Sequence, residues 1–289
     1  MNKFNKSITF VIVSYNSSHV IEKCIKSINK SIKVIIIENS NNQFIKNYLE
    51  KKFSNVKVFL SEKNLGYAAG NNLGISKVKT QYAFILNPDA YLKKNTLKEI
   101  YKAVITLKDD FSIIAPNLKK NYGYFSKPVN NFNKNILSVD YVIGFAMLLN
   151  LKDIKLKEIF DKKFFLFLEE IDLCRRIKKL NKKIYIVRKS KVFHNARKAS
   201  GNSFSIELCR NWHWMWSLFY YNFKHFGAFV AYQVTISKFF SSLIKLSIGL
   251  IFFKKKIFLL NKYRLLGLFN SYIKKTSWLR PSDIKGFTN

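Results

Sequence analysis

In the first half of the chain, short runs of apolar residues alternate with segments whose apolar residues recur at helical spacing. Short, wholly apolar runs are typical of strands that are buried on both faces of a sheet. The expected strands cover residues 8–13, 34–37, 56–60, 82–86 and 112–115, and the expected helices cover 20–28, 44–49, 66–78 and 96–107. Strands that alternate with helices form mostly parallel sheets with right-handed crossovers. We therefore expect an α/β fold with a mostly parallel sheet flanked by helices.

Polar clusters follow three of these expected strands directly. They are Ser14-Tyr15-Asn16, Glu38-Asn39-Ser40 and Asn87-Pro88-Asp89. Each cluster alone fits ordinary turn chemistry, since Asn, Ser and Pro are common in turns. Ligands of parallel sheets, however, gather at the carboxyl ends of the strands. Three clusters at one sheet edge favour a binding pocket there.

The second half carries a dense acidic cluster in a chain that is poor in acids. Glu169, Glu170 and Asp172 directly follow the aromatic run 164–168, and a helix is expected from there to about Leu180, with Asn181 as its left-handed cap. One interpretation is a capped helix stabilised by an Asp172–Arg176 pair. The other is a carboxylate held against apolar walls, where burial raises its pKa and makes it a general base.

Three further features complete the second half. Residues 117–140 are poorly periodic and are expected to form a surface excursion, whereas 141–149 predict a strand with Gly144 inside it. Glycine within a strand often marks the close approach of a ligand or another backbone. Short strands at 185–187 and 191–193 end at His194. A lone histidine is usually just hydrogen-bonded; as a metal ligand it needs a partner, for which Asp89 is the natural choice.

The charge balance is strongly basic, with 51 Lys+Arg against 17 Asp+Glu and a net charge of +34. Such a charge favours anionic partners, but the lysines are scattered over the whole length and form no nucleic-acid-binding motif, which fits compositional drift. The three cysteines have unrelated spacings, which argues against a disulfide framework or zinc ribbon and indicates a reducing compartment. The apolar run 8–13 is too short for a signal peptide, so we expect a cytosolic start.

The C-terminal third is rich in aromatic and apolar residues. The segment 227–253 is long enough to span a bilayer, but Lys238 and Lys245 lie inside it, which disfavours a spanning helix. Trp and Tyr with flanking lysines fit a helix in the bilayer interface; the alternative is helices that only cover one side of a catalytic domain. We expect a domain over 1–204, followed by an amphipathic, membrane-associating helical region over 205–289.

Several motifs together resemble the inverting family-2 glycosyltransferases of GT-A fold, specifically the rhamnosyltransferase-like and galactofuranosyltransferase-like members. The motifs occur in the family's order and cover roughly residues 7–225. The most specific combination is the glycine- and asparagine-rich segment, the Asn-Pro-Asp turn and the later Glu-Glu-x-Asp-Leu-Cys. The matching stretches are 11–16, 38–40, 64–75, 86–90 and 164–176, followed by His194.

The resemblance implies roles for individual residues. Glu170 corresponds to the catalytic base, with Glu169 as the neighbour with which it could be confused, and Gly144 and Phe145 would lie under the acceptor. Asp89 corresponds to the retained acid of an Asp-x-Asp motif and, with His194, would bind Mg²⁺ or Mn²⁺. Asn87 replaces an acid of other branches, which leaves metal dependence open. Donor-side residues are Ser14, Tyr15, Asn16, Glu38, Asn64, Gly70, Asn71, Asn87 and Asp89, with Arg197 and Lys198 steadying the diphosphate.

These expectations describe a cytoplasmic enzyme at the inner face of the cell membrane, without a nucleic-acid partner. It would transfer a sugar, with rhamnosyl favoured, from a nucleotide-diphospho-sugar to a lipid-linked or polysaccharide acceptor with inversion, in bacterial surface glycan biosynthesis (O-antigen, capsule or lipooligosaccharide). The alternatives are a galactofuranosyl or other hexosyl transferase, a non-catalytic glycan- or nucleotide-binding relative, and a basic adaptor that binds anionic lipid or nucleic acid.

Overall fold

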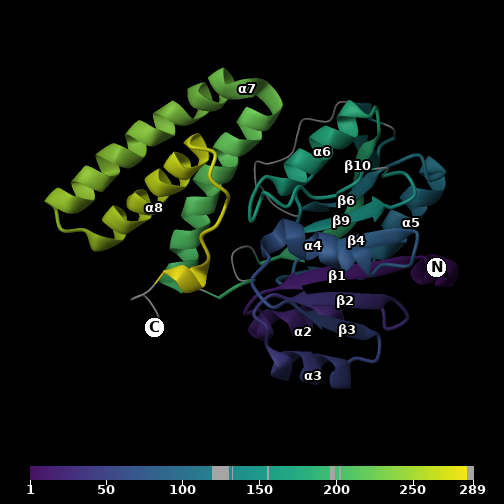
Figure 1. Ribbon diagram of the computed structural model, residues 1–289. Helices are drawn as coiled ribbons and strands as arrows, with labels where there is room; N and C mark the ends of the chain where they lie inside the picture. Colours follow the sequence, from purple (N-terminus) through teal and green to yellow (C-terminus); the bar gives the residue numbers. More distant parts are fainter. Residues whose placement is uncertain (119–129, 132, 155, 196–198, 202, 285–289) are drawn as a thin grey trace. The chain divides into compact units, whose positions relative to one another are not determined.

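The computed structural model describes residues 1–118, 130–131, 133–154, 156–195, 199–201 and 203–284 (Figure 1). The chain divides into two compact units. The first comprises Met1–Asp161 and Glu170–Gly201, and the second comprises Lys162–Glu169 and Asn202–Asn289.

The first unit is built on one mixed sheet with the strand order β3-β2-β1-β4-β9-β6-β10-β8-β7, and β5 pairs with β10 at its margin. Its strands are β1 (Ile8–Ser14), β2 (Lys33–Glu38), β3 (Val56–Leu60), β4 (Tyr82–Leu86), β5 (Ala90–Leu92), β6 (Ile113–Leu118), β7 (Asn130–Asn131), β8 (Ile136–Ser138), β9 (Ala146–Asn150) and β10 (Ile184–His194). Its helices are α1 (Asn2–Lys6), α2 (Ser18–Lys26), α3 (Gln43–Lys52), α4 (Gly66–Ser76), α5 (Thr96–Leu107) and α6 (Glu169–Lys179), the last beginning with a residue of the second unit.

The expected parallel arrangement holds for the half of the sheet formed by β3, β2, β1 and β4. Side chains on both faces of β1, β2 and β4 are mostly buried, whereas the edge strand β3 exposes Lys57. The rings of Phe10 and Phe84 stack in the core with their centroids 4.6 Å apart. Beyond β4 the sheet is mixed, because β9 runs antiparallel to both β4 and β6. The apolar runs predict β1, β2 and β4 well because burial on both faces removes any polar alternation.

Two strand predictions need correction. The expected strand over 141–149 begins only at Ala146, and Gly144 lies in the turn before it, where its carbonyl accepts a hydrogen bond from the Tyr67 hydroxyl instead of joining the ladder. The two short strands expected at 185–187 and 191–193 are one strand, β10, with a register shift between Val187 and Lys191. The bulge exposes polar residues in mid-strand, and the sequence pattern therefore breaks there.

The acidic cluster forms the start of a helix, as expected. Helix α6 ends at Lys179, and Asn181 adopts the left-handed conformation (φ 56°) that closes it. Asp172 is fully buried and pairs with Arg176 over 2.7 Å, and the same guanidinium donates to the carbonyl of Glu158 at 3.0 Å. Asp172 therefore has the structural role, and the chemistry of the cluster rests on the two glutamates. The expected surface excursion contains β7 and β8, while residues 119–129 and 132 lie outside the described part of the chain.

The second unit consists of α7 (Phe204–Ile251), α8 (Lys255–Tyr272) and the short 3₁₀ helix η1 (Pro281–Asp283). Gly227 breaks α7 with φ 86°, and after it the chain reverses and runs beside α8 (Figure 1). The helices approach closely at Gly267, where a Cβ would lie 2.2 Å from the carbonyl oxygen of Trp212. His213 lies buried beside them with Nε2 2.8 Å from the Leu279 carbonyl oxygen, and burial lowers its pKa to about 3. It is therefore a neutral, structural histidine.

Among the described residues, α7 alone has the length and composition of a membrane-crossing helix, with a mean hydropathy of 1.5 in its most apolar window, of which 17% is buried. The part of α7 after Gly227 accounts for most of this exposure. Phe229 is 80% exposed, and Phe240, Ile244 and Ile251 recur at helical spacing and are each more than half exposed.

Candidate active site

The first two polar clusters lie side by side at the carboxyl ends of β1 and β2. Ser14 and Glu38 are partners in the parallel ladder, and the amide of Asn39 donates to the Ser14 carbonyl at 2.7 Å. The amide of Asn16, which has φ 51°, donates to the Ser40 hydroxyl at 3.0 Å. Ser40 in turn donates its amide to Glu38 Oε1 at 2.8 Å. The two clusters therefore form one hydrogen-bonded edge that includes Tyr15.

Helix α4 packs directly against this edge. A Cβ on Gly70 would lie 2.9 Å from a methyl group of Val13, so glycine at this position allows the helix to touch the sheet. Asn39 joins the two elements, because its amide donates to the Gly66 carbonyl at 3.1 Å. Asn71 is fully buried and donates to the Tyr67 carbonyl at 2.9 Å, while its Oδ1 has no hydrogen-bond partner among the described residues.

Asn64 shapes the entry to the same helix, since its Oδ1 accepts a hydrogen bond from the Gly66 amide at 3.0 Å. The structure thus brings the donor-side residues from the first 75 residues to one sheet edge, with Gly70 acting there through packing.

The third polar cluster forms the turn between β4 and β5. The amide of Asn87 donates to the Phe145 carbonyl at 2.8 Å, which fixes the turn to the segment before β9. Asp89 is 5% exposed, and its Oδ1 lies 3.2 Å from His194 Nε2 without a well-aligned hydrogen bond. The His194 ring stacks on Phe145 with centroids 4.6 Å apart. Two residues far apart in sequence, Asp89 and His194, therefore meet at the end of the β5–β10 ladder.

Glu170 packs against Gly144, the residue before Phe145. A Cβ on Gly144 would lie 3.2 Å from Glu170 Cβ and 2.9 Å from the Tyr67 hydroxyl oxygen, so only glycine fits there without displacement. Burial raises the pKa of the Glu170 carboxyl above its ordinary value, although backbone amides including that of Gly144 donate to it and partly oppose the shift. Its Oε2 is buried and has no hydrogen-bond partner in the described structure.

Gly144 and Phe145 connect the two acidic groups. Glu170 packs against Gly144, and the ring of the next residue, Phe145, stacks on the imidazole that contacts Asp89. Two neighbouring residues of one turn thus connect Glu170 with the imidazole beside Asp89. Glu169 is also buried, but it belongs to the second unit and Glu170 is the acid in contact with Gly144.

The Asp89–His194 pair offers one oxygen and one nitrogen to a metal ion. No group of three or more His, Cys, Asp or Glu residues in the described part of the chain has the geometry of a metal site. Mg²⁺ and Mn²⁺, however, commonly use one or two protein ligands and take the remainder from water and substrate phosphates. A buried Asp89 Oδ1 with no aligned donor fits such a cation. Arg197 and Lys198, the other cations expected here, lie outside the described residues.

Two residues at this site carried no separate prediction. Tyr67 supports Gly144 through its hydroxyl, and it lies within the glycine- and asparagine-rich motif that could have singled it out. Cys24 lies with Sγ 3.5 Å from the Asn87 carbonyl oxygen, and burial together with the negative charge of Asp89 raises the pKa of its thiol. Nothing in the sequence marks Cys24, because it occupies an ordinary apolar position of helix α2.

This combination of a sheet-edge polar cluster, a buried acid in the Asn-Pro-Asp turn and a second carboxylate across a glycine defines a GT-A glycosyltransferase fold. The model of the family described as "Glycosyl transferase family 2" matches residues 9–174, which is more than half of the chain. The chain therefore belongs to glycosyl transferase family 2, and the resemblance seen in its motifs is confirmed at that level.

A curated relative is the low-salt glycan biosynthesis hexosyltransferase Agl10 of Haloferax volcanii, which is 26% identical over 142 residues. This match covers 41% of the chain and 45% of that protein, so it spans less than half of the relative's length.

Solved structures of low sequence identity share the fold. The mannosyltransferase PcManGT from Pyrobaculum calidifontis, in complex with GDP-Man and Mn²⁺, has a TM-score of 0.56 at 12% identity, and the match covers 92% of this chain and 87% of that one. GalNAc-T7 with UDP, GalNAc and Mn²⁺ has a TM-score of 0.54 at 16% identity, covering 68% of this chain and 45% of that chain. Both neighbours thus contain a nucleotide or nucleotide-sugar and Mn²⁺.

Proposed function

We propose that the chain is an inverting glycosyltransferase that moves a sugar from a nucleotide-diphospho-sugar to a glycan acceptor. The observation that carries the proposal is the turn Gly144–Phe145, in which Gly144 contacts Glu170 and Phe145 stacks on the His194 ring beside Asp89. A basic carboxylate and a diphosphate-facing acid are the two groups that such a transfer needs.

The nucleotide would bind at the edge formed by β1 and β2. Ser14, Tyr15 and Asn16 would line the base and ribose, and Glu38 offers a carboxylate to the nucleotide. Asn71 offers a buried Oδ1 that lacks a partner within the described chain. The UDP and GDP-Man bound by the structural neighbours support a nucleotide or nucleotide-sugar as the ligand.

The diphosphate would face Asp89 and His194, which would hold Mg²⁺ or Mn²⁺. When bound, the ion neutralises the charge of the diphosphate and makes it a better leaving group. Asn87 occupies the place of a further acid, and its backbone amide is already used by the Phe145 carbonyl. This site therefore carries less negative charge than one with two acids. Such a site favours a donor whose own phosphate groups supply further ligands to the metal ion.

Glu170 would act as the general base. Its raised pKa makes it a stronger proton acceptor than an exposed carboxylate, and its buried Oε2 has no hydrogen-bond partner among the described residues, which leaves it able to accept from a substrate hydroxyl. The acceptor hydroxyl gives its proton to Glu170 while its oxygen bonds to the anomeric carbon. The bond from that carbon to the diphosphate breaks on the opposite face, so the configuration is inverted.

The finer assignment extends the resemblance in the motifs. A rhamnosyl donor is favoured, with galactofuranosyl or another hexosyl donor as the alternative within the same family. The acceptor would be a lipid-linked or polysaccharide intermediate of a bacterial surface glycan such as O-antigen, capsule or lipooligosaccharide. The glycan-biosynthesis hexosyltransferase from Haloferax volcanii supports the general class of acceptor.

A membrane-surface location would suit a lipid-linked acceptor. The second unit exposes apolar side chains on α7 after Gly227, and the three lysines 254–256 follow that helix. Exposed apolar residues with flanking lysines favour the interface of an anionic bilayer. Together with the cytosolic start expected from the sequence, this surface leads us to propose a location at the cytoplasmic face of the cell membrane.

The test is acceptor-dependent release of nucleoside diphosphate. The purified chain is first screened against a panel of nucleotide-sugars with Mg²⁺ or Mn²⁺, by the rise in melting temperature. The stabilising donor is then mixed with membrane lipid extract as the acceptor source. Release of nucleoside diphosphate only when both substrates are present supports the proposal. Donor binding without such release would identify a non-catalytic relative.

A further inference from the structure

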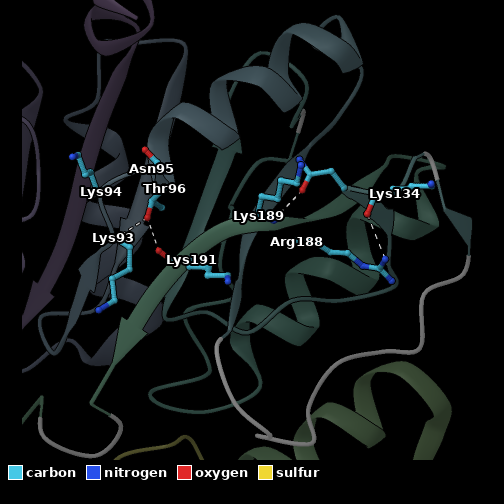
Figure 2. A pocket seen from close by; sticks show the side chains of 9 residues that line it. Lys93, Lys94, Asn95, Thr96, Lys134, Arg188, Lys189 and Lys191 are labelled. Atoms are coloured by element: carbon cyan, nitrogen blue, oxygen red, sulfur yellow. Dashed lines mark hydrogen bonds between the residues drawn. The ribbon is translucent and has the colours of Figure 1, made fainter.

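The first unit carries a basic groove that the proposed chemistry does not use. We call it the basic groove (Figure 2), and its volume is about 610 Å³. It is lined by Lys93–Thr96, Lys134, Asn135, Arg188, Lys189 and Lys191. Six of its nine lining residues are Lys or Arg and none is an acid, whereas Lys and Arg make up 51 of the chain's 289 residues. Compositional drift spreads lysines evenly and does not explain such a concentration.

The cations of the basic groove have no acidic partner in the described part of the chain. Among the described residues, no ion pair includes any of the six. A neighbouring hollow of about 320 Å³ shares Lys93 and Lys94 and adds Lys26 and Lys98, which extends the positive surface. Uncompensated charges of one sign in a concave site raise the local concentration of anions.

Backbone hydrogen bonds hold the three segments of the groove together (Figure 2). The amide of Lys93 donates to the Lys191 carbonyl at 3.2 Å, and the Thr96 hydroxyl donates to the same carbonyl. On the other side, the amide of Lys189 donates to Asn135 Oδ1 at 2.9 Å. Arg188 and Lys189 lie within the register shift between Val187 and Lys191, and both are exposed. The like charges are thus held close by the fold and do not meet by chance.

The basic groove also lies next to the candidate active site. Strands β5 and β10 pair Ala90 with His194 at one end of their ladder, and the groove begins with Lys93 and Lys191 at the other end. Lys191 and His194 are three residue steps apart along the strand, or about 10 Å. Between them, the rings of Tyr91 and Phe193 stack 4.7 Å apart, with the ammonium group of Lys93 5.2 Å from the centre of the Tyr91 ring.

We propose that the basic groove binds an anionic stretch of the acceptor glycan, one whose sugars carry carboxylate or phosphate groups. That the glycan is an acceptor rests on the proposed function, whereas the binding of an anionic glycan to the groove does not. A groove suits an extended chain better than a flat bilayer, and exposed lysines and an arginine suit charges repeated along that chain. The half-exposed Phe193 at the Tyr91–Phe193 pair offers an apolar surface for the sugar that connects the groove to the reacting end.

The test measures binding of hexagalacturonate, an oligosaccharide with one carboxylate per sugar, by calorimetry with the full chain. The variant is Lys94→Gln/Lys189→Gln/Lys191→Gln, all three side chains being exposed. The control is Lys33→Gln/Lys51→Gln/Lys79→Gln, which removes the same charge from exposed lysines elsewhere in the first unit. We expect the groove variant to bind about tenfold more weakly, since three exposed charge contacts are lost and each contributes roughly 1.5-fold to fivefold in affinity. The control should bind within about twofold of the unmodified protein.

Three results would overturn the proposal. The first is an equal loss of hexagalacturonate affinity in both triple variants, which would report net charge only. The second is that the neutral maltohexaose binds as well as hexagalacturonate. The third is that the two variants differ only in their binding to phosphatidylglycerol vesicles. Donor-induced stabilisation should be unchanged in the groove variant. Because binding is read without transfer, a failure of the transferase proposal leaves this result intact, and a loss of hexagalacturonate binding leaves the transferase proposal intact.

Discussion

The two units of the chain differ in what they do with large apolar side chains. The first unit buries nearly all of them in one core around the sheet, and six remain exposed among its described residues, whereas the smaller second unit exposes 17. In the first unit, buried polar residues gather at the sheet edge and at the turn that contains Gly144. In the second unit, it is the apolar residues that are exposed on the surface. The first unit therefore carries the candidate active site, and the second carries an exposed apolar surface.

The largest effect should come from the base of the first unit. Glu170→Gln keeps the size and hydrogen-bonding shape of the side chain but cannot accept the proton, so transfer should fall by about a thousandfold. Donor-induced stabilisation should persist, because the donor edge is built from β1 and β2. Nucleoside diphosphate release measures the first effect and the melting temperature the second.

The matched control is Glu99→Gln, which alters another acid in the first turn of a helix, α5. Its turnover should stay close to that of the unmodified chain. If Glu170→Gln turns over at a near-normal rate, Glu170 is not the base, and Glu169→Gln becomes the next variant to measure.

The next effect concerns the metal-facing acid. Asp89→Ala removes the carboxylate that lies 3.2 Å from His194, so donor affinity in the presence of Mn²⁺ should fall by about tenfold to a hundredfold. Calorimetry with and without Mn²⁺ separates the metal-dependent part. Asp140→Ala, at an exposed aspartate that pairs with Lys178, serves as the control. An unchanged Mn²⁺ dependence in Asp89→Ala would remove the metal from this site.

The contrast between the units can be tested with exposed apolar side chains from each. Phe240→Ser/Ile244→Ser/Ile251→Ser removes one stripe of α7, and Phe44→Ser/Ile105→Ser/Leu180→Ser removes three exposed apolar residues of the first unit. Sedimentation with phosphatidylglycerol vesicles should show at least about a tenfold loss of binding for the α7 variant only, because buried apolar area drives interfacial binding. Equal behaviour of the two variants would contradict a membrane role for the second unit.

The sequence predicts the parallel half of the sheet because β1, β2 and β4 are nearly continuous apolar runs, whereas the edge strand β3 alternates, with Lys57 exposed. The carboxyl ends of β1, β2 and β4 then follow as the place of the polar clusters. The second half is harder to predict, because its backbone depends on side-chain partners that are distant in sequence. The turn at Gly144 looks like part of a strand until the Tyr67 hydroxyl and Glu170 are seen to occupy its hydrogen-bonding groups.

The candidate site shows the same limit. Asp89 and His194 could be paired from chemistry alone, because a lone histidine at a strand end needs a partner and acids are scarce in this chain. Glu169 and Glu170 could not be told apart, because consecutive residues at a helix start differ only in the direction of their side chains. The basic groove could not be predicted from the sequence, because its cations come from three separate segments and look like scattered lysines along the chain.

A smaller effect is expected at the glycine that separates the two acidic groups. In Gly144→Ala the new methyl group would overlap the Tyr67 hydroxyl and press on Glu170 Cβ, so kcat should fall by about tenfold and unfolding should become easier by about 1–3 kcal/mol. Tyr67→Phe/Gly144→Ala removes the closer of the two overlaps and should regain part of the stability. No recovery in the double variant would show that the contact with Glu170 dominates.

The smallest effect is the pH dependence that the buried base imposes on the first unit. Because burial raises the pKa of Glu170, the folded protein holds a proton that the unfolded chain has already released at the same pH. The protonated carboxyl therefore stabilises the fold below the ordinary pKa of about 4.5, and this contribution is lost as pH rises through the raised value. Melting temperatures measured against pH should show that loss, of a few degrees, in the unmodified chain but not in Glu170→Gln. The rate of transfer should rise over the same pH range, since the base must be deprotonated to act. If the melting temperatures of the two proteins change with pH in the same way, the Glu170 carboxyl is solvated.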